Sequence, residues 1–298
     1  MPATRRPTAI VVGVLATLLL LVGCTDGPRP QTARPDVTAR PSPADTAAAL
    51  PTVGSYVSLG DSFTSGPGLA NLQDGAGLCL RSDHNWPSLL ADLLQASRFD
   101  DVSCAGARTR DIRQPAAGLT GARPQIAAVT GSTDLVTVGI GGNDGGLFSS
   151  LIGACTRAND TCASFARDGA PAILARTVRD VEASLDAIKA IAPDATVVLV
   201  GYLRIMPETG TCRSIDIPSA DAAALVATEE ALDRSLSVAA RGADVTFVSL
   251  RAASRGHDAC AGSRAWTNGA APTGRDGIAF HPRLAGMRAV ARAVADAL

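Results

Sequence analysis

The chain has 298 residues, of which 46% are apolar, and its formal net charge is −1. This length and apolar content suffice for one sizeable hydrophobic core, although length alone also allows two domains. The near-zero charge comes without a basic cluster, so the composition argues against nucleic acid as a partner.

The first 23 residues have the pattern of an export signal. Two arginines precede an apolar run over residues 9–22, which is shorter than the roughly 20 residues that a membrane-spanning helix needs. The sequence Leu-Val-Gly-Cys then ends at Cys24 and has the form of a lipobox, where the signal is cut before a lipidated cysteine. We therefore expect a lipoprotein signal peptide over residues 1–23 and lipidation of Cys24. An uncleaved signal anchor and an ordinary secretory signal are the alternatives.

Residues 24–52 contain the expected lipidated cysteine and then a stretch rich in Pro, Thr, Ala, Asp and Arg, without an apolar period. This composition predicts a disordered tether with an average end-to-end distance of about 30 Å. Residues 53–298 would then form the folded domain. We expect this domain outside the cytoplasm, held by its lipid on the outer face of the cell membrane, with partial release as an alternative.

Five apolar segments typical of strands alternate with segments of helical apolar spacing. The strand candidates are residues 55–60, 99–104, 134–140, 195–201 and 244–249. The helix candidates are residues 87–95, 170–191, 219–241 and 284–297. This alternation predicts a parallel sheet covered on both faces, and therefore an α/β protein with a flavodoxin-like three-layer α/β/α sandwich.

Three of the strand candidates are followed by a glycine-containing turn. Ser62 follows the first in the sequence Gly-Asp-Ser, Gly106 follows the second, and Asn143 follows the third in Gly-Gly-Asn-Asp. His281 comes near the C-terminus in Phe-His-Pro. An α/β sheet presents its reactive groups at the carboxyl ends of its strands. A serine, a glycine, an asparagine and a histidine, in that order, are the parts that acyl transfer requires.

These four motifs resemble those of the SGNH hydrolases, the family of GDSL esterases and lipases, from about residue 53 to the end. The resemblance implies a sheet of five strands, with Ser62 as nucleophile and His281 as general base. It implies an oxyanion hole formed by the backbone N–H groups of Ser62 and Gly106 and the side-chain amide of Asn143. We therefore expect a serine esterase or lipase that hydrolyses carboxylic esters, in particular lipid acyl esters, without a metal or organic cofactor.

One position departs from the family pattern. Many members carry an aspartate three residues before the histidine, but this chain has Ile278 there. The nearest carboxylate is Asp276, five residues before His281. The resemblance to some secreted members implies that the backbone carbonyl near Ile278 orients the histidine, which would give a Ser-His dyad. A triad completed by Asp276 is the alternative.

Other residues compete for roles in this site. His257 is a rival base because a carboxylate follows it, whereas His84 is interpreted as a surface or wall residue. Trp86 and Trp266 are candidates for an acyl pocket, although aromatic residues in irregular loops more often fill core edges.

Cysteine usage indicates disulfide bonds. The chain has seven cysteines, and six remain when Cys24 is set aside, an even number in an exported chain. Cys155 and Cys162 flank a short polar loop and can pair locally, which leaves sequential pairing as the simplest arrangement of the others. The predicted pairs are Cys79–Cys104, Cys155–Cys162 and Cys212–Cys260. Metal binding is disfavoured because neither a C-x-x-C pair nor a histidine cluster accompanies them.

Several functions fit this pattern. Within enzymes, a phospholipase A and a polysaccharide O-deacetylase could use the same site. Outside enzymes, the alternative is a surface-binding lipoprotein that keeps the fold without turnover, since fold does not determine function. For each of these we expect a monomer that meets the membrane through Cys24.

Overall fold

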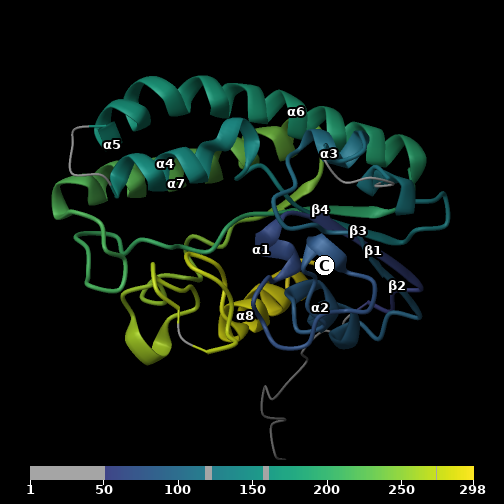
Figure 1. Ribbon diagram of the computed structural model, residues 1–298. Coiled ribbons are helices and arrows are strands. Elements are labelled where there is room, and N and C mark those ends of the chain that lie inside the picture. Colours follow the sequence, from purple (N-terminus) through teal and green to yellow (C-terminus); the bar gives the residue numbers. More distant parts are fainter. Residues whose placement is uncertain (1–50, 118–122, 157–160, 273) are drawn as a thin grey trace, which may run out of the picture. The chain divides into compact units, whose positions relative to one another are not determined.

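A computed structural model describes residues 51–117, 123–156, 161–272 and 274–298 (Figure 1). The predicted signal peptide, Cys24 and nearly all of the predicted tether therefore lie outside the described residues. Within the described ranges, no helix combines the length and the apolar content needed to cross a bilayer.

Five parallel strands form one sheet in the order β2-β1-β3-β4-β5. The strands are β1 (Ser55–Gly60), β2 (Arg98–Asp101), β3 (Leu135–Gly139), β4 (Thr196–Val200) and β5 (Thr246–Val248). The predicted parallel sheet with flavodoxin-like order is therefore confirmed. The order in which strands are added to the sheet reverses between β1 and β3. In open α/β sheets, ligands bind at the carboxyl ends of the strands at such a switch point.

Five helices have eight residues or more in the described part of the chain: α2 (Trp86–Leu93), α4 (Leu147–Cys155), α6 (Ala170–Ile191), α7 (Ser219–Gly242) and α8 (Leu284–Ala295). The shorter helical segments are α1 (Ser62–Ser65), η1 (Gly77–Cys79), α3 (Arg110–Arg113), η2 (Gln125–Ala128), η3 (Asp144–Gly146), α5 (Thr161–Ser164), η4 (Phe165–Gly169) and η5 (Gly262–Arg264). The four predicted helices appear as α2, α6, α7 and α8. The helix α4 was not predicted, and it begins directly after two glycines with positive φ.

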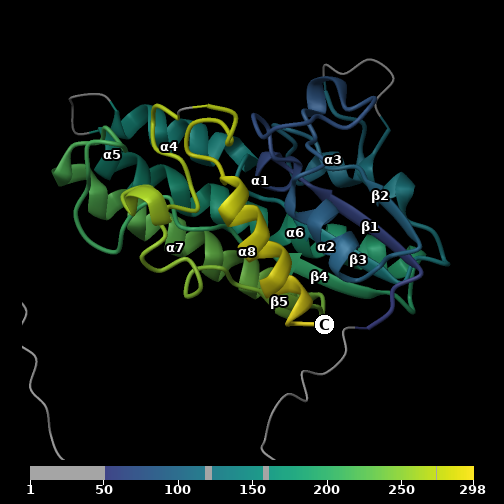
Figure 2. The ribbon, with the colours of Figure 1, turned by 90° about the horizontal axis from the view of Figure 1, so that it is seen from below.

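Successive side chains along a strand point to opposite faces of the sheet, and each face is buried in its own core cluster. In β1, Val57 and Leu59 belong to the core cluster that includes α6 and α7, whereas Tyr56 belongs to the cluster that includes α2 and α8. This is the period-two pattern of a strand covered on both sides. In Figure 1, α6 and α7 lie on one side of the sheet and α2 and α8 on the other, and Figure 2 shows α2 and α8 in front of the strands.

The second strand ends earlier than predicted, at Asp101 instead of residue 104. The Asp101 carboxylate accepts hydrogen bonds from the backbone N–H of Ser103 at 3.0 Å and from its hydroxyl at 2.6 Å. These bonds form a local side-chain turn at the end of the strand. The backbone N–H groups of Val102 and Cys104 still donate to the β1 carbonyls of Ser58 at 2.9 Å and Gly60 at 3.0 Å, so the chain stays beside β1 as far as Cys104 and then begins the turn that contains Gly106.

The three disulfides of the structure join Cys79 to Cys104, Cys155 to Cys162 and Cys212 to Cys260. The last two lie in or against a third core cluster, which packs α4, α5 and the start of α7 against the loop that follows β4. The Cys79–Cys104 disulfide ties the loop after α1 to the turn after β2. The Cys212–Cys260 disulfide ties the loop after β4 to the irregular segment after β5.

Candidate active site

Ser62 lies in a tight turn between β1 and the one-turn helix α1. The backbone N–H of Asp61 donates to the carbonyl of Gly139 at 2.9 Å, which extends the pairing of β1 with β3 to the residue before Ser62. The Asp61 side chain then caps α1 by accepting the N–H of Phe63 at 2.9 Å. A Cβ at Gly60 would lie 2.7 Å from the Gly139 carbonyl oxygen, so the strand can end this close to β3 only with glycine. Ser62 is thereby held at the carboxyl end of β1.

His281 contacts Ser62 although 219 residues separate them in the sequence. Its Nε2 lies 2.8 Å from the Ser62 Oγ, and its Nδ1 lies 2.7 Å from the carbonyl oxygen of Ala279. Because a carbonyl only accepts, Nδ1 carries the ring proton and Nε2 accepts the serine hydroxyl. Burial lowers the pKa of His281, against the opposing effect of the Ala279 carbonyl, and so favours the neutral ring that a general base requires.

The acceptor of the His281 Nδ1 proton in the structure is the carbonyl of Ala279, the residue that follows Ile278. The carbonyl of Ile278 instead accepts the backbone N–H of His281 at 3.2 Å, closing a turn. Within that turn Phe280 has a φ of 59°, which turns the Ala279 carbonyl toward the imidazole. Asp276 is not the partner either, because its carboxylate accepts the Arg283 Nε at 2.7 Å and the N–H of Leu284 at 2.6 Å.

Gly106 and Asn143 lie in the turns that follow β2 and β3. Gly106 has a φ of 78°, and, its two chain neighbours aside, none of the described residues has an atom within 4 Å of the position that a Cβ would take, so these residues leave this side of the turn open. The Asn143 amide donates to the carbonyl of Ala107 at 3.0 Å, and this hydrogen bond links the two turns. Its second N–H has no hydrogen-bond partner among the residues that the structure describes. The two predicted oxyanion donors thus lie in directly connected turns.

A second connection between these turns comes from Asp144, to which sequence analysis gave no role. Its carboxylate accepts the backbone N–H of Thr109 at 2.8 Å and the Thr109 hydroxyl at 2.6 Å. Burial raises the pKa of Asp144, and the hydrogen bonds to Thr109 oppose this effect. Asp144 therefore holds the segment after Gly106 against the segment that carries Asn143.

Tyr202, to which the sequence-based predictions gave no role, connects the turn that contains Ser62 to the turn that contains Asn143. Its hydroxyl lies 2.5 Å from the Asp61 Oδ2 and 2.8 Å from the backbone N of Gly142. Burial raises the pKa of Asp61 to about 7, an effect that the bond from Tyr202 opposes, and burial also raises the pKa of the Tyr202 phenol. The available sequence signal was the position of Tyr202, directly after the predicted strand over residues 195–201.

The rival residues lie elsewhere. His257 stacks on Trp266 with 4.1 Å between ring centroids, and its Nδ1 lies 2.7 Å from the carbonyl of Arg264. Trp86 is the first residue of α2 and is buried in the core that α2 and α8 form with the sheet. Neither tryptophan is among the residues that line a cavity beside Gly106. Among the residues with described positions, no three His, Cys, Asp or Glu side chains are grouped so that they could hold a metal ion.

A cavity of about 650 Å³ opens beside Gly106. The Cys79–Cys104 disulfide forms part of its wall, together with the exposed Leu78 and several alanines, and the charged groups at the wall are Arg81, Asp111 and Arg123. The backbone N–H of Ala105 donates to the carbonyl of Cys79 at 3.0 Å, which adds a hydrogen bond beside the disulfide. The wall of this cavity is therefore tied directly to the turn that carries Gly106.

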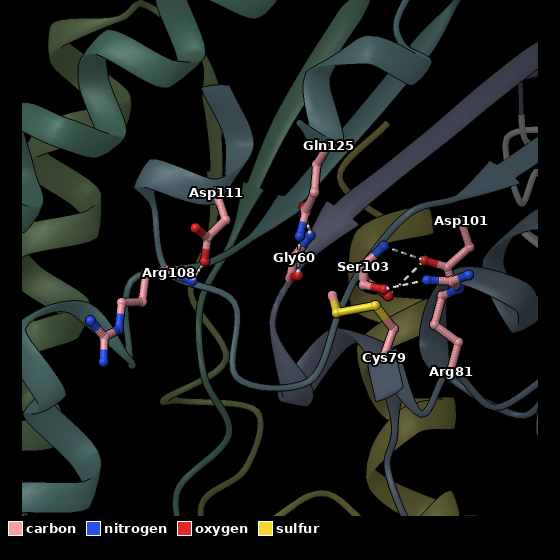
Figure 3. The surroundings of a disulfide bond; sticks show 9 residues. Gly60, Cys79, Arg81, Asp101, Ser103, Arg108, Asp111 and Gln125 are labelled. Carbon is pink, nitrogen blue, oxygen red and sulfur yellow. Dashed lines mark hydrogen bonds between the residues drawn. A yellow bond between two sulfur atoms is a disulfide. The ribbon is translucent and has the colours of Figure 1, made fainter. Parts of the chain in front are cut away.

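Gln125 connects the same cavity to the end of β1. Its side chain accepts the backbone N–H of Gly60 at 2.8 Å and donates to the carbonyl of Gly60 at 2.9 Å. Figure 3 shows this pair on one side of Cys79 and, on the other, Arg81, whose guanidinium donates to the Ser103 carbonyl at 2.9 Å. The end of β1 before the Ser62 turn, the cavity and the disulfide are thus connected.

Known proteins resemble this chain over most of its length. A profile of the GDSL-like lipase/acylhydrolase family matches residues 58–289. Lipase 2 of Streptomyces coelicolor is 33% identical over 314 aligned residues, which cover 100% of this chain and 98% of the relative. The crystal structure of an extracellular lipase from Streptomyces rimosus has a TM-score of 0.72 at 27% identity, covering 82% of this chain and 100% of that one. That of phospholipase A1 from Streptomyces albidoflavus has a TM-score of 0.68 at 27% identity, covering 83% and 100%.

Proposed function

Because this chain belongs to the GDSL-like lipase/acylhydrolase family and is a carboxylic ester hydrolase, we propose that Ser62 and His281 perform its chemistry. The observation that carries this proposal is the contact of 2.8 Å between the Ser62 Oγ and the His281 Nε2. The Ala279 carbonyl supports it by keeping the ring proton on Nδ1. The site is then a dyad with a backbone orienting group.

In the proposed reaction, His281 takes the hydroxyl proton as the Ser62 Oγ attacks the ester carbonyl carbon. The carbonyl oxygen becomes an oxyanion, which the N–H groups of Ser62 and Gly106 and the free N–H of the Asn143 amide stabilise. The tetrahedral intermediate collapses when His281 gives its proton to the departing alcohol oxygen, and Ser62 remains acylated. Water then attacks the acyl-enzyme by the same steps and releases the carboxylic acid.

We further propose lipid acyl esters as the substrate class. The support is the cavity of about 650 Å³ beside Gly106, whose apolar wall portions could take a hydrocarbon chain. A phospholipase A activity is favoured by the likeness to the Streptomyces albidoflavus phospholipase A1. A polysaccharide O-deacetylase and a binding protein without turnover are the outcomes that the following experiment would reveal instead.

The test is a panel of esters of increasing acyl length, including a phospholipid and an acetylated polysaccharide, combined with fluorophosphonate labelling. Ser62→Ala should abolish hydrolysis and labelling with little change in thermal stability, because the proposed contribution of Ser62 is chemical. Ser65→Ala is the matched control, since Ser65 is buried in the same short helix and its hydroxyl has no hydrogen-bond partner within the described part of the chain. Persistent labelling of Ser62→Ala would contradict the assignment, and preference for acetyl esters of polysaccharide would contradict the lipid substrate.

For its location, we propose an extracytoplasmic monomer, residues 53–298, tethered by a lipid on Cys24. The three disulfides support a location outside the cytoplasm, because such bonds persist in oxidising compartments. Cys24→Ser should move the protein from the membrane fraction to the soluble fraction or stop its processing, with unchanged activity of the isolated domain. Membrane association at the normal processed mass in this variant would contradict lipidation.

A further inference from the structure

The hydroxyl of Tyr202 lies between two turns that are far apart in the sequence. Tyr202 is 141 residues from Asp61, its hydrogen-bond acceptor, and 60 residues from Gly142, its donor. Asp61 directly precedes Ser62, and Gly142 directly precedes Asn143. A single oxygen atom thus connects the residue before the nucleophile with the residue before the oxyanion amide.

The direction of each hydrogen bond in this connection is determined by chemistry. The Gly142 N–H can only donate, so the Tyr202 oxygen accepts from it and directs its own proton to the Asp61 carboxylate. The other oxygen of that carboxylate accepts the N–H of Phe63 at 2.9 Å. Both Asp61 oxygens are therefore used, and with the carboxylate ionised the Tyr202 hydroxyl is the donor of this bond.

The surroundings leave the Tyr202 ring little freedom. The ring meets Phe63 edge-on with 5.0 Å between centroids and Phe148 edge-on with 5.4 Å. Tyr202 is 7% exposed and Asp61 is 1% exposed, so water has little access to replace the hydroxyl. A buried hydrogen bond in such a site is costly to leave unmade.

We propose that Tyr202 is a positioning residue that sets the place of the Asn143 amide relative to Ser62 in the transition state. This inference rests on the proposed function, since it concerns the geometry of that oxyanion hole. Without the hydroxyl, the Gly142 N–H and the Asp61 carboxylate lose their common partner, and the Asn143 turn moves relative to the nucleophile turn. A displacement of about 1 Å at reacting groups can reduce the rate by about 10².

The second tyrosine of the chain provides a matched control. Tyr56 is also buried, and its hydroxyl also makes a short hydrogen bond, at 2.8 Å to the Thr137 hydroxyl. Both residues of that pair lie within strands β1 and β3 and not in a turn at their carboxyl ends. Tyr56→Phe therefore removes a comparable buried hydroxyl from the same sheet without touching the oxyanion turns.

The experiment compares Tyr202→Phe with Tyr56→Phe on a soluble short-chain p-nitrophenyl ester. Active sites are titrated with a fluorophosphonate, so that kcat counts only folded, competent protein, and thermal unfolding is recorded. Tyr202→Phe keeps the ring and its packing on Phe63 and Phe148, and it should lower kcat by about 10- to 100-fold with KM within about threefold. Tyr56→Phe should leave both constants within about twofold.

A double-mutant cycle then tests whether Tyr202 acts through Asn143. In an Asn143→Ala background, Tyr202→Phe should cost less than about threefold in kcat, because the group that Tyr202 positions is already absent. An unchanged kcat in Tyr202→Phe, a change in KM alone, or the same loss in both backgrounds would overturn the inference. Failure of the proposed function itself is recognised separately, since Ser62→Ala would then keep wild-type activity.

Discussion

Replacing Asp276 by asparagine tests whether a carboxylate takes part in catalysis. In the structure the His281 Nδ1 bonds to the Ala279 carbonyl at 2.7 Å, and Asp276 bonds to Arg283 and Leu284 instead. Asp276→Asn should therefore change kcat by less than about tenfold. A carboxylate that orients a catalytic histidine behaves differently, because its loss can cost on the order of 10⁴.

Stability should respond to the same substitution. The side chains of Asp276 and Arg283 are each about one-third exposed, 32% and 33%, so their ion pair contributes at most about 1 kcal/mol. The carboxylate also accepts the N–H of Leu284, the first residue of α8, and a negative charge at a helix N-terminus adds about 0.3 to 1 kcal/mol. Asparagine keeps one oxygen acceptor but loses the charge. We therefore expect a loss of about 1 kcal/mol and a Tm lower by about 2 to 4 °C.

The assay measures kcat per titrated active site and thermal unfolding on the same preparation. Arg283→Gln is the matched control, because it removes the same ion pair from the other side and leaves the carboxylate in place. Both variants should show a small decrease in Tm and near-normal kcat. A loss above a thousandfold in Asp276→Asn alone, with folding intact, would refute the dyad and make Asp276 the third member of a triad.

Three further predictions concern the oxyanion hole, the base and a disulfide. Asn143→Ala should lower kcat by about 10² to 10³ with little change in KM, because its amide is proposed to bind charge that forms only in the transition state; an effect on KM alone would instead indicate substrate binding. The kcat/KM profile should fall as pH decreases through the pKa of His281, and because burial lowers this pKa, the midpoint should lie below the ordinary value of about 6.5; a midpoint above it would contradict the described environment. Replacing Cys212 and Cys260 together by serine should lower the free energy of unfolding by about 4 kcal/mol in the chain-entropy model for a sequence separation of 48, as measured by urea unfolding; an unchanged midpoint would show that the loop is already held without the bond.

Features that depend on local pattern were predictable from the sequence. The bounds predicted for β1 and for α6 coincide with those of the structure, because each lies between clear turn signals and has its own apolar period. The parallel sheet followed from the alternation of strands and helices. Ser62 and His281 could be proposed as site residues from the sequence because each lies in one of four short motifs that occur together in a given order. Their direct contact agrees with the proposed chemistry.

The tertiary structure alone decided which groups surround these residues. The His281 Nδ1 bonds to the carbonyl of Ala279 and not to that of Ile278 because Phe280 has a left-handed conformation. No residue pattern in the sequence predicts that conformation. The connection from Tyr202 to Asp61 exists only because parallel strands bring their carboxyl ends to one edge of the sheet. Hydrogen-bond partners of this kind depend on atomic distances between segments far apart in the chain, whereas strand and helix patterns depend on neighbouring residues.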